Sequence, residues 1–96
     1  MNKHIILLFI ILCIGLTKAS AQHSITGKVL DATNQEPIPF ASVTIKNVKS
    51  GTTTDNNGNF TLKVNNNDIL IVSFMGYETK EVNIGTQKKV TILLSE

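Results

Sequence analysis

Four polar residues surround a glycine in the segment DNNGN, Asp55 to Asn59, and their oxygen atoms are of the kind that calcium binds. An EF-hand loop needs Asp at its first position, Gly at its sixth and a bidentate Glu at its twelfth. With Gly58 sixth, Thr53 and Val64 occupy the two anchor positions, and with Asp55 first, Phe60 replaces the glycine. A tight turn explains the segment better, because Asn57-Gly58 is a type I′ pair. The sequence therefore predicts a turn and no calcium site.

Catalytic chemistry has few residues to use after residue 21. That part of the chain contains one histidine, His23, no arginine and no cysteine. A serine nucleophile needs a neighbouring base, and zinc needs three or four nitrogen, sulfur or oxygen ligands. Glu78 and Glu81 would fall on opposite faces of a strand. The sequence therefore predicts no catalytic, cofactor-binding or metal-binding residues, and a protein that is not an enzyme.

The first 21 residues have the composition of a secretory signal peptide. Lys3 and His4 precede the apolar run IILLFIILCIGL, and Ala19 and Ala21 form an A-x-A cleavage motif. The run is shorter than the about 20 residues that a membrane-spanning helix needs. Lipid attachment at Cys13 is the alternative, but it is disfavoured because Leu12, rather than a small residue, precedes the cysteine. We expect cleavage before Gln22 and a single exported domain over residues 22–96, with no direct membrane insertion after cleavage.

The expected mature chain is electrically neutral. Lys3 and Lys18 account for the whole excess of two positive charges, so no basic patch indicates nucleic-acid binding. An exported domain without cysteine cannot form a disulfide, and a domain this small is marginally stable alone. It must therefore bury a well-formed apolar core or contact a partner.

Apolar and polar residues alternate through most of the remaining sequence, which indicates β-strands. The expected strands are Ser24–Leu30, Phe40–Val48, a short one near Gly51–Thr54, Asn59–Val64, Asp68–Phe74, Thr79–Ile84 and Lys89–Leu94. The continuous apolar run in Asp68–Phe74 suggests a central strand that is buried on both faces. Turn residues separate these segments, so we expect an all-β antiparallel sandwich. The predicted core comprises Val29, Val43, Ile45, Phe60, Leu62, Ile71, Phe74, Val82 and Ile92.

Several ordered motifs in this chain resemble those of the carboxypeptidase regulatory-like domain, a transthyretin-like (prealbumin-like) family. The motif residues are Gly27, Val29 and Asp31; Pro37, Ile38, Ala41 and Val43; Gly51, Thr52, Thr54, Asp55, Gly58 and Phe60; and the turn Met75-Gly76-Tyr77. The resemblance covers nearly the whole expected mature chain, and only Met75 departs from the usual Ile or Leu. It implies a seven-stranded sandwich in which Asp55 and Gly58 shape a hairpin turn.

The resemblance also implies a function. The family commonly stands at the N-terminus of SusC-type TonB-dependent outer-membrane transporters, ahead of the plug and barrel. We therefore expect a non-catalytic interaction domain of a nutrient uptake system, in the periplasm or on the periplasmic face of the outer membrane. The expected partner is an envelope protein, either such a transporter or a surface lipoprotein. The sequence leaves open whether the chain is a free-standing domain or the N-terminal piece of a transporter.

A free-standing periplasmic binding domain for a glycan or a peptide is the alternative function, and it would require exposed aromatic residues on one face. For the interaction domain, the short apolar segment Lys89–Leu94 is the expected docking edge, since an unpaired strand accepts an added one. Leu93 falls on its second face. The alternative to docking is that Lys88 and Lys89, at the start of this segment, are gatekeepers against uncontrolled pairing. Tyr77 suits either partner recognition or a half-buried wedge after a glycine turn.

Overall fold

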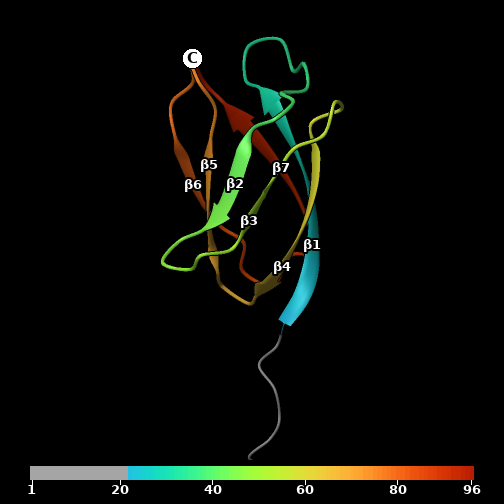
Figure 1. Ribbon diagram of the computed structural model, residues 1–96. Coiled ribbons are helices and arrows are strands. Elements are labelled where there is room, and N and C mark those ends of the chain that lie inside the picture. Colours follow the sequence, from blue (N-terminus) through green and yellow to red (C-terminus); the bar gives the residue numbers. More distant parts are fainter. Residues whose placement is uncertain (1–21) are drawn as a thin grey trace, which may run out of the picture.

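The computed structural model of the protein describes residues 22–96, which form seven strands and no helix. The strands are β1 (Gln22–Asp31), β2 (Ser42–Ile45), β3 (Gly51–Thr53), β4 (Asn59–Asn65), β5 (Ile69–Ser73), β6 (Lys80–Asn83) and β7 (Lys89–Leu94). They form a three-stranded sheet, β4-β1-β7, and a four-stranded sheet, β3-β2-β5-β6 (Figure 1). The expected seven-stranded β-sandwich is confirmed. The expected signal peptide and its cleavage site lie outside the described residues.

The three-stranded sheet is built on β1, the longest strand. β1 pairs antiparallel with β4, from Gln22 opposite Asn65 to Lys28 opposite Asn59. On its other side β1 pairs parallel with β7, from Thr26 opposite Lys89 to Asp31 opposite Leu94. The sequence predicted an entirely antiparallel sandwich, and this was wrong for one pair of strands, because β1 and β7 are parallel. A parallel pair needs a long connection, and here the whole second sheet lies between the two strands in sequence.

The four-stranded sheet is antiparallel throughout. β2 pairs with β3 and β5, and β5 pairs with β6. The short strand expected near Gly51 is present as β3, at one edge of this sheet. β6 forms the other edge, so β2 and β5 are the two interior strands.

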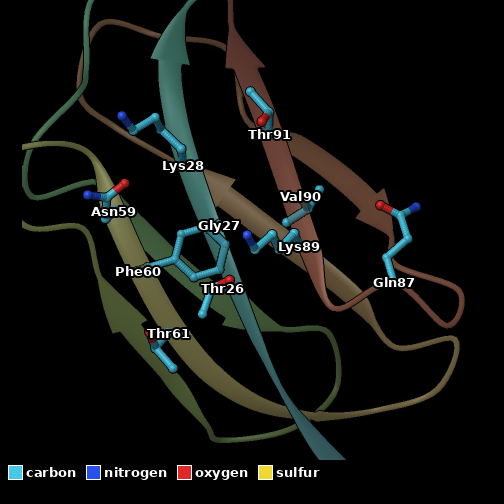
Figure 2. A pocket seen from close by; sticks show the side chains of 10 residues that line it. All are labelled: Thr26, Gly27, Lys28, Asn59, Phe60, Thr61, Gln87, Lys89, Val90 and Thr91. Atoms are coloured by element: carbon cyan, nitrogen blue, oxygen red, sulfur yellow. The ribbon is translucent and has the colours of Figure 1, made fainter.

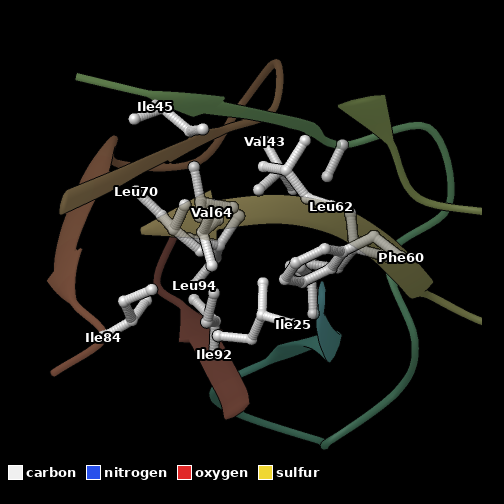
Figure 3. Close-up of a cluster of buried hydrophobic side chains, with 14 residues drawn as sticks. Ile25, Val43, Ile45, Phe60, Leu62, Val64, Leu70, Ile84, Ile92 and Leu94 are labelled. Carbon is white, nitrogen blue, oxygen red and sulfur yellow. The ribbon is translucent and has the colours of Figure 1, made fainter. Parts of the chain in front are cut away.

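The core lies between the sheets and consists of aliphatic side chains and one phenylalanine (Figure 3). Six of the predicted core residues are buried: Val29, Val43, Ile45, Phe60, Leu62 and Ile92. Phe74 and Val82 are partly buried and pack against the cluster. Further residues are buried that were not among the predicted core residues, including Ile25, Val64, Leu70, Val72, Ile84 and Leu94.

The assignment of Ile71 to the core was wrong. β5 alternates like the other strands, so Leu70 and Val72 are buried while Ile69 and Ile71 are only half-buried on its outer face. The continuous apolar run predicted a strand covered on both faces, but no further layer covers the outer face within residues 22–96. The interior position of β5 in its sheet was predicted correctly.

Gly27 makes room for the one aromatic ring in the core. A Cβ atom at residue 27 would overlap the ring of Phe60, which lies opposite Gly27 in the β1–β4 ladder. Phe60 is 5% exposed. The absent side chain on β1 therefore lets the ring of the neighbouring strand lie against the sheet.

Candidate functional site

Groups of titratable side chains do not mark an active site in the described part of the chain. Within residues 22–96 no three side chains of the His, Cys, Asp or Glu type come together as metal ligands would. His23 lies on β1, and its Nε2 atom is 3.1 Å from the carbonyl oxygen of Gln87. The absence of catalytic, cofactor-binding and metal-binding residues stays a prediction.

The DNNGN segment forms a turn built around the Asp55 carboxylate. Its Oδ1 atom accepts hydrogen bonds from the amides of Asn57 and Asn59, each at 2.9 Å. The amide of Gly58 donates to the Asp55 carbonyl, and the amide of Asp55 donates to the Asn59 carbonyl. This is the pattern of a type I turn followed by a bulge residue with positive φ.

The prediction of a type I′ turn at Asn57-Gly58 was wrong. Gly58 has a φ of 76°, while Asn57 is not among the residues with positive φ. The turn also does not close a two-stranded ladder, because β3 and β4 belong to different sheets. A Cβ at Gly58 would lie 2.7 Å from the carbonyl oxygen of Val29, so close approach to β1 also favours glycine there.

Asp31 and Tyr77 connect the two sheets at one end of the sandwich. Asp31 ends β1 and is 7% exposed, and its Oδ2 accepts a 2.6 Å hydrogen bond from the Tyr77 hydroxyl. Its Oδ1 accepts from the amides of Thr33 and Asn34 at 2.7 and 3.4 Å. The ring of Tyr77 packs against Phe74 with centroids 6.0 Å apart. Tyr77 is thus the half-buried wedge that was one of its two expected roles.

The hydrogen bond between Tyr77 and Asp31 shifts the pKa values of both side chains. Donation from Tyr77, then from the Thr33 amide, holds the pKa of the Asp31 carboxyl below its ordinary value despite burial. The same bond, with burial and the nearby charges of Asp31, Glu96 and Glu36, raises the pKa of Tyr77 to about 12. Asp31 therefore remains charged and Tyr77 protonated near neutral pH, which suits a structural link rather than proton transfer.

A second buried polar group, Thr54, fixes the loop between β1 and β2. Thr54 is 1% exposed, and its Oγ1 donates to the Ile38 carbonyl at 2.7 Å and accepts from the Ala41 amide at 2.8 Å. The Thr54 amide donates to the Ala41 carbonyl, and the Thr54 carbonyl accepts from the Phe40 amide, both at 3.0 Å. All four hydrogen bonds join one residue to the segment 38–41.

The segment held by Thr54 presents an exposed aromatic residue. Phe40 has a φ of 60° and its side chain is 67% exposed. The left-handed region is unfavourable for a bulky side chain. This feature was not predicted from the sequence, because PIPFA carries no glycine or asparagine that would signal positive φ. The role of Thr54 was equally hidden among three consecutive threonines.

The expected docking edge lies on the surface of the three-stranded sheet. β7 has β1 as its single neighbour in that sheet. The Lys88 and Leu94 carbonyls accept hydrogen bonds from Thr26 and Ala32 at the two ends of the β1–β7 pair, so even-numbered residues of β7 turn their backbone groups toward β1. The odd-numbered residues Lys89, Thr91 and Leu93 turn theirs toward the edge.

Part of this edge is already occupied. The Leu93 carbonyl accepts a 3.2 Å hydrogen bond from Lys80 Nζ, and the Ser95 carbonyl accepts a 2.7 Å bond from the Glu78 amide. These contacts join the end of β7 and the residue after it to Glu78 and Lys80, at the start of β6 in the other sheet. The backbone at Lys89 and Thr91 forms the open stretch.

A shallow hollow of about 510 Å³ lies over the same sheet, across β4, β1 and β7 (Figure 2). Threonines, lysines and amides predominate in its lining, with Thr26, Lys28, Lys89 and Thr91 among them, and no carboxylate. Gly27, Phe60 and Val90 complete the lining, and a hollow this open to solvent does not enclose a small ligand as binding pockets do. It extends the open part of the β7 edge into a polar surface.

Comparison with solved structures agrees with the fold. A putative membrane-associated protein of unknown function from Bacteroides fragilis superposes with a TM-score of 0.59 and 23% identity, covering 81% of this chain and 29% of that one. At this identity the likeness concerns the fold alone.

Comparison of sequences identifies a group of relatives. The TonB-dependent receptor SusC of Bacteroides thetaiotaomicron is 34% identical over 92 residues, which is 96% of this chain and 9% of the receptor. The TonB-dependent receptor P3 of Formosa agariphila is 28% identical over 93 residues, again 9% of its length. The chain therefore spans about a tenth of the length of these receptors. The family model described as the CarboxypepD_reg-like domain matches residues 25–96. The fold, the ordered motifs and this match together establish that the chain belongs to the CarboxypepD_reg-like domain family.

Proposed function

We propose that residues 22–96 are a non-catalytic docking domain of a TonB-dependent uptake system of the outer membrane, exported to the periplasmic side. One observation carries the proposal: the chain aligns over nearly its whole length with TonB-dependent receptors while spanning 9% of theirs. A segment shared with such receptors is best explained as a module that contacts their other parts or their partners. The envelope partner is a transporter of this type or a surface lipoprotein.

The open edge of β7 is the proposed docking surface. An added strand would satisfy the outward backbone groups at Lys89 and Thr91, as in other cases of strand addition. The side chains of Lys89, Thr91 and Leu93 are exposed and would lie on the outer face of the extended sheet. Lys88 and Lys89 act here as gatekeepers that limit pairing to a partner able to match their charge.

Glycan binding has less support. Carbohydrate sites need aromatic rings gathered on one face, and within residues 22–96 Phe40 is the one aromatic residue whose side chain is largely exposed. Phe60 is buried, while Phe74 and Tyr77 are half-buried and packed against the core. The aromatic residues therefore contribute to packing and not to a platform.

The test is photocrosslinking in the periplasm from a photoreactive residue at position 91, compared with position 61. Thr61 is a matched control, because it is exposed on β4, at the opposite edge of the same sheet. We expect position 91 to crosslink a TonB-dependent transporter or a surface lipoprotein, and position 61 to give no such product.

A backbone variant sharpens the test. Thr91→Pro removes an outward amide and blocks strand addition without removing a hydrogen bond to β1, since proline is tolerated where the amide faces solvent. Crosslinking from position 89 should be lost in Thr91→Pro and kept in Thr61→Pro. Equal crosslinking in both variants, or crosslinks from position 77 and none from 91, would refute docking at this edge.

A further inference from the structure

Two large apolar side chains project from the same end of the sandwich. Phe40 is 67% exposed and Met75 is 91% exposed. Ser42 of β2 pairs with Ser73 of β5 at the end of their ladder. Phe40, two residues before Ser42, and Met75, two residues after Ser73, therefore both lie just beyond that end. We call this end, made of segments 32–41, 54–58, 74–79 and 95–96, the loop end; it is the end of the sandwich at which the C-terminus is marked in Figure 1.

The backbone holds Phe40 outward at an energetic cost. A phenylalanine with a φ of 60° is strained, and such conformations persist only where the surroundings impose them. The four hydrogen bonds of Thr54 to segment 38–41 impose it here. Glycine or asparagine would adopt this backbone more readily, and burial does not explain an aromatic ring that is mostly in solvent.

The loop that carries Met75 is also fixed in place. The Tyr77 hydroxyl binds Asp31, and the Glu78 amide binds the Ser95 carbonyl. Gly76, with a φ of 90°, makes the turn that separates Met75 from the Tyr77 wedge. Both apolar residues therefore project from ordered loops, which reduces the entropy lost when a partner binds.

Charge is segregated along the molecule although the described chain is neutral. The loop end contains Glu36, Asp55, Glu78 and Glu96 and no lysine. The opposite end, segments 46–50, 66–68 and 84–89, contains Lys46, Lys49, Lys88 and Lys89 with Asp68 as its one acid. Phe40 and Met75 thus lie on segments whose charged residues are all acidic, and Lys80, just beyond segment 74–79, donates to the Leu93 carbonyl.

We propose that the loop end is a second docking surface, on which Phe40 and Met75 hold an apolar side chain of a lysine- or arginine-flanked segment of a partner protein. Complementary charge selects this occupant, because the acidic surroundings attract cations and repel anionic lipid headgroups. The inference rests on the proposed docking role but uses a surface at one end of the sandwich, away from the open stretch of the β7 edge at Lys89 and Thr91.

The test uses the 96-residue chain labelled with [methyl-¹³C]methionine. The sequence contains two methionines, Met1 and Met75, so the Met75 methyl group is a specific reporter of the loop end. One synthetic peptide carries a leucine flanked by lysines, and its matched control carries glutamates in place of the lysines. We expect the lysine peptide to shift the Met75 methyl resonance in a saturable way that weakens with salt. The glutamate peptide should leave the resonance unchanged.

Paired variants separate binding from folding. Phe40→Asn should weaken binding of the lysine peptide by about tenfold or more, as truncation of a central aromatic does. It should leave Tm unchanged or raise it, because asparagine tolerates positive φ. Val48→Asn is the matched control, since Val48 is 54% exposed between Lys46 and Lys49 at the opposite end, and it should change neither quantity.

Three results would overturn the inference: no shift of the Met75 methyl resonance with the lysine peptide, equal shifts with both peptides, or a Tm loss in Phe40→Asn that marks the ring as structural. Thr91→Pro distinguishes this failure from failure of the β7 edge. That variant should abolish edge crosslinking and leave peptide binding at the loop end unchanged.

Discussion

The hydroxyl of Tyr77 donates a 2.6 Å hydrogen bond to Oδ2 of Asp31, 46 residues away in sequence and in the other half of the sandwich. Asp31 ends β1 of the three-stranded sheet, and Tyr77 follows β5 of the four-stranded sheet. Two motifs that are separate in sequence, the Gly27-Val29-Asp31 set and the Met75-Gly76-Tyr77 turn, therefore meet in one contact. This contact fixes the loop end on which Met75 is displayed.

Removing the hydroxyl should destabilise the protein in a pH-dependent way. The pKa of Asp31 is lower in the folded chain, so its contribution is present above the unfolded value near 3.8 and is lost as pH falls through the folded pKa. The pKa of Tyr77 is raised from 10.0 to about 12, so its contribution is complete below pH 10 and is lost as pH rises through 12. Tyr77→Phe should lower Tm by a few degrees at neutral pH and flatten both limbs of the profile.

The check on this prediction is thermal unfolding followed by circular dichroism across the pH range. Tyr77 is the single tyrosine of the sequence, so its ultraviolet absorbance titration reports its pKa directly. An ordinary tyrosine pKa in the folded wild-type protein would contradict the link.

Thr54→Val should be strongly destabilising although the two side chains have similar shapes. Valine cannot bond the Ile38 carbonyl or the Ala41 amide, and each buried unpaired group costs about 1–3 kcal/mol. Urea unfolding measures the loss. Thr53→Val, at an exposed neighbouring position, should stay within about 0.5 kcal/mol of wild type. Equal effects of the two substitutions would show that the Thr54 hydroxyl does not hold the loop.

Phe60→Ala should come close to unfolding the domain. The ring is 5% exposed and lies against Gly27, and emptying a core aromatic costs about 3–5 kcal/mol. Domains have a total stability of about 5–15 kcal/mol, and small ones lie at the lower end. Thr61→Ala, one residue away on the exposed face, is the control. A Phe60→Ala variant with wild-type Tm would exclude Phe60 from the core.

Calcium should not bind tightly to the DNNGN turn. The Asp55 Oδ1 atom already accepts two amide hydrogen bonds. Titration calorimetry should give no dissociation constant below about 10⁻⁵ M, within the range of calcium sensors. Asp55→Ala should cost about 1 kcal/mol through the lost turn bonds, equally with calcium or with chelator. Stabilisation by calcium in wild type alone would indicate a site after all.

Export should remove residues 1 to 21. The A-x-A motif at Ala19 and Ala21 places the cleavage before Gln22. Intact-mass analysis of protein recovered from the periplasm should show a chain starting at Gln22. A product that carries a lipid-sized mass on Cys13 would instead identify a lipoprotein.

The sequence alone determined the elements of the fold. Alternation of apolar and polar residues located most of the strands, because a strand with one buried face must place apolar residues at every second position. β5 was instead expected from a continuous apolar run, and β3 from the β-prone segment Gly51–Thr54. Ordered motifs then identified the family and its sandwich. The apolar run in Asp68–Phe74 wrongly predicted that Ile71 belongs to the core. An isoleucine on the outer face of a strand cannot be distinguished by residue type from one on the buried face.

Only the tertiary structure decided which residues meet. The parallel pairing of β1 with β7, the Asp31–Tyr77 bond and the Thr54 bonds to segment 38–41 all join residues distant in sequence. The left-handed Phe40 has no local signal, because long-range hydrogen bonds impose it against the residue's own preference. The division of a neutral chain into an acidic and a basic end likewise follows from strand order. The alternation of neighbouring residues determines which face of a strand is buried. Which strands pair depends on contacts between residues distant in sequence, and no local pattern in the sequence specifies these contacts.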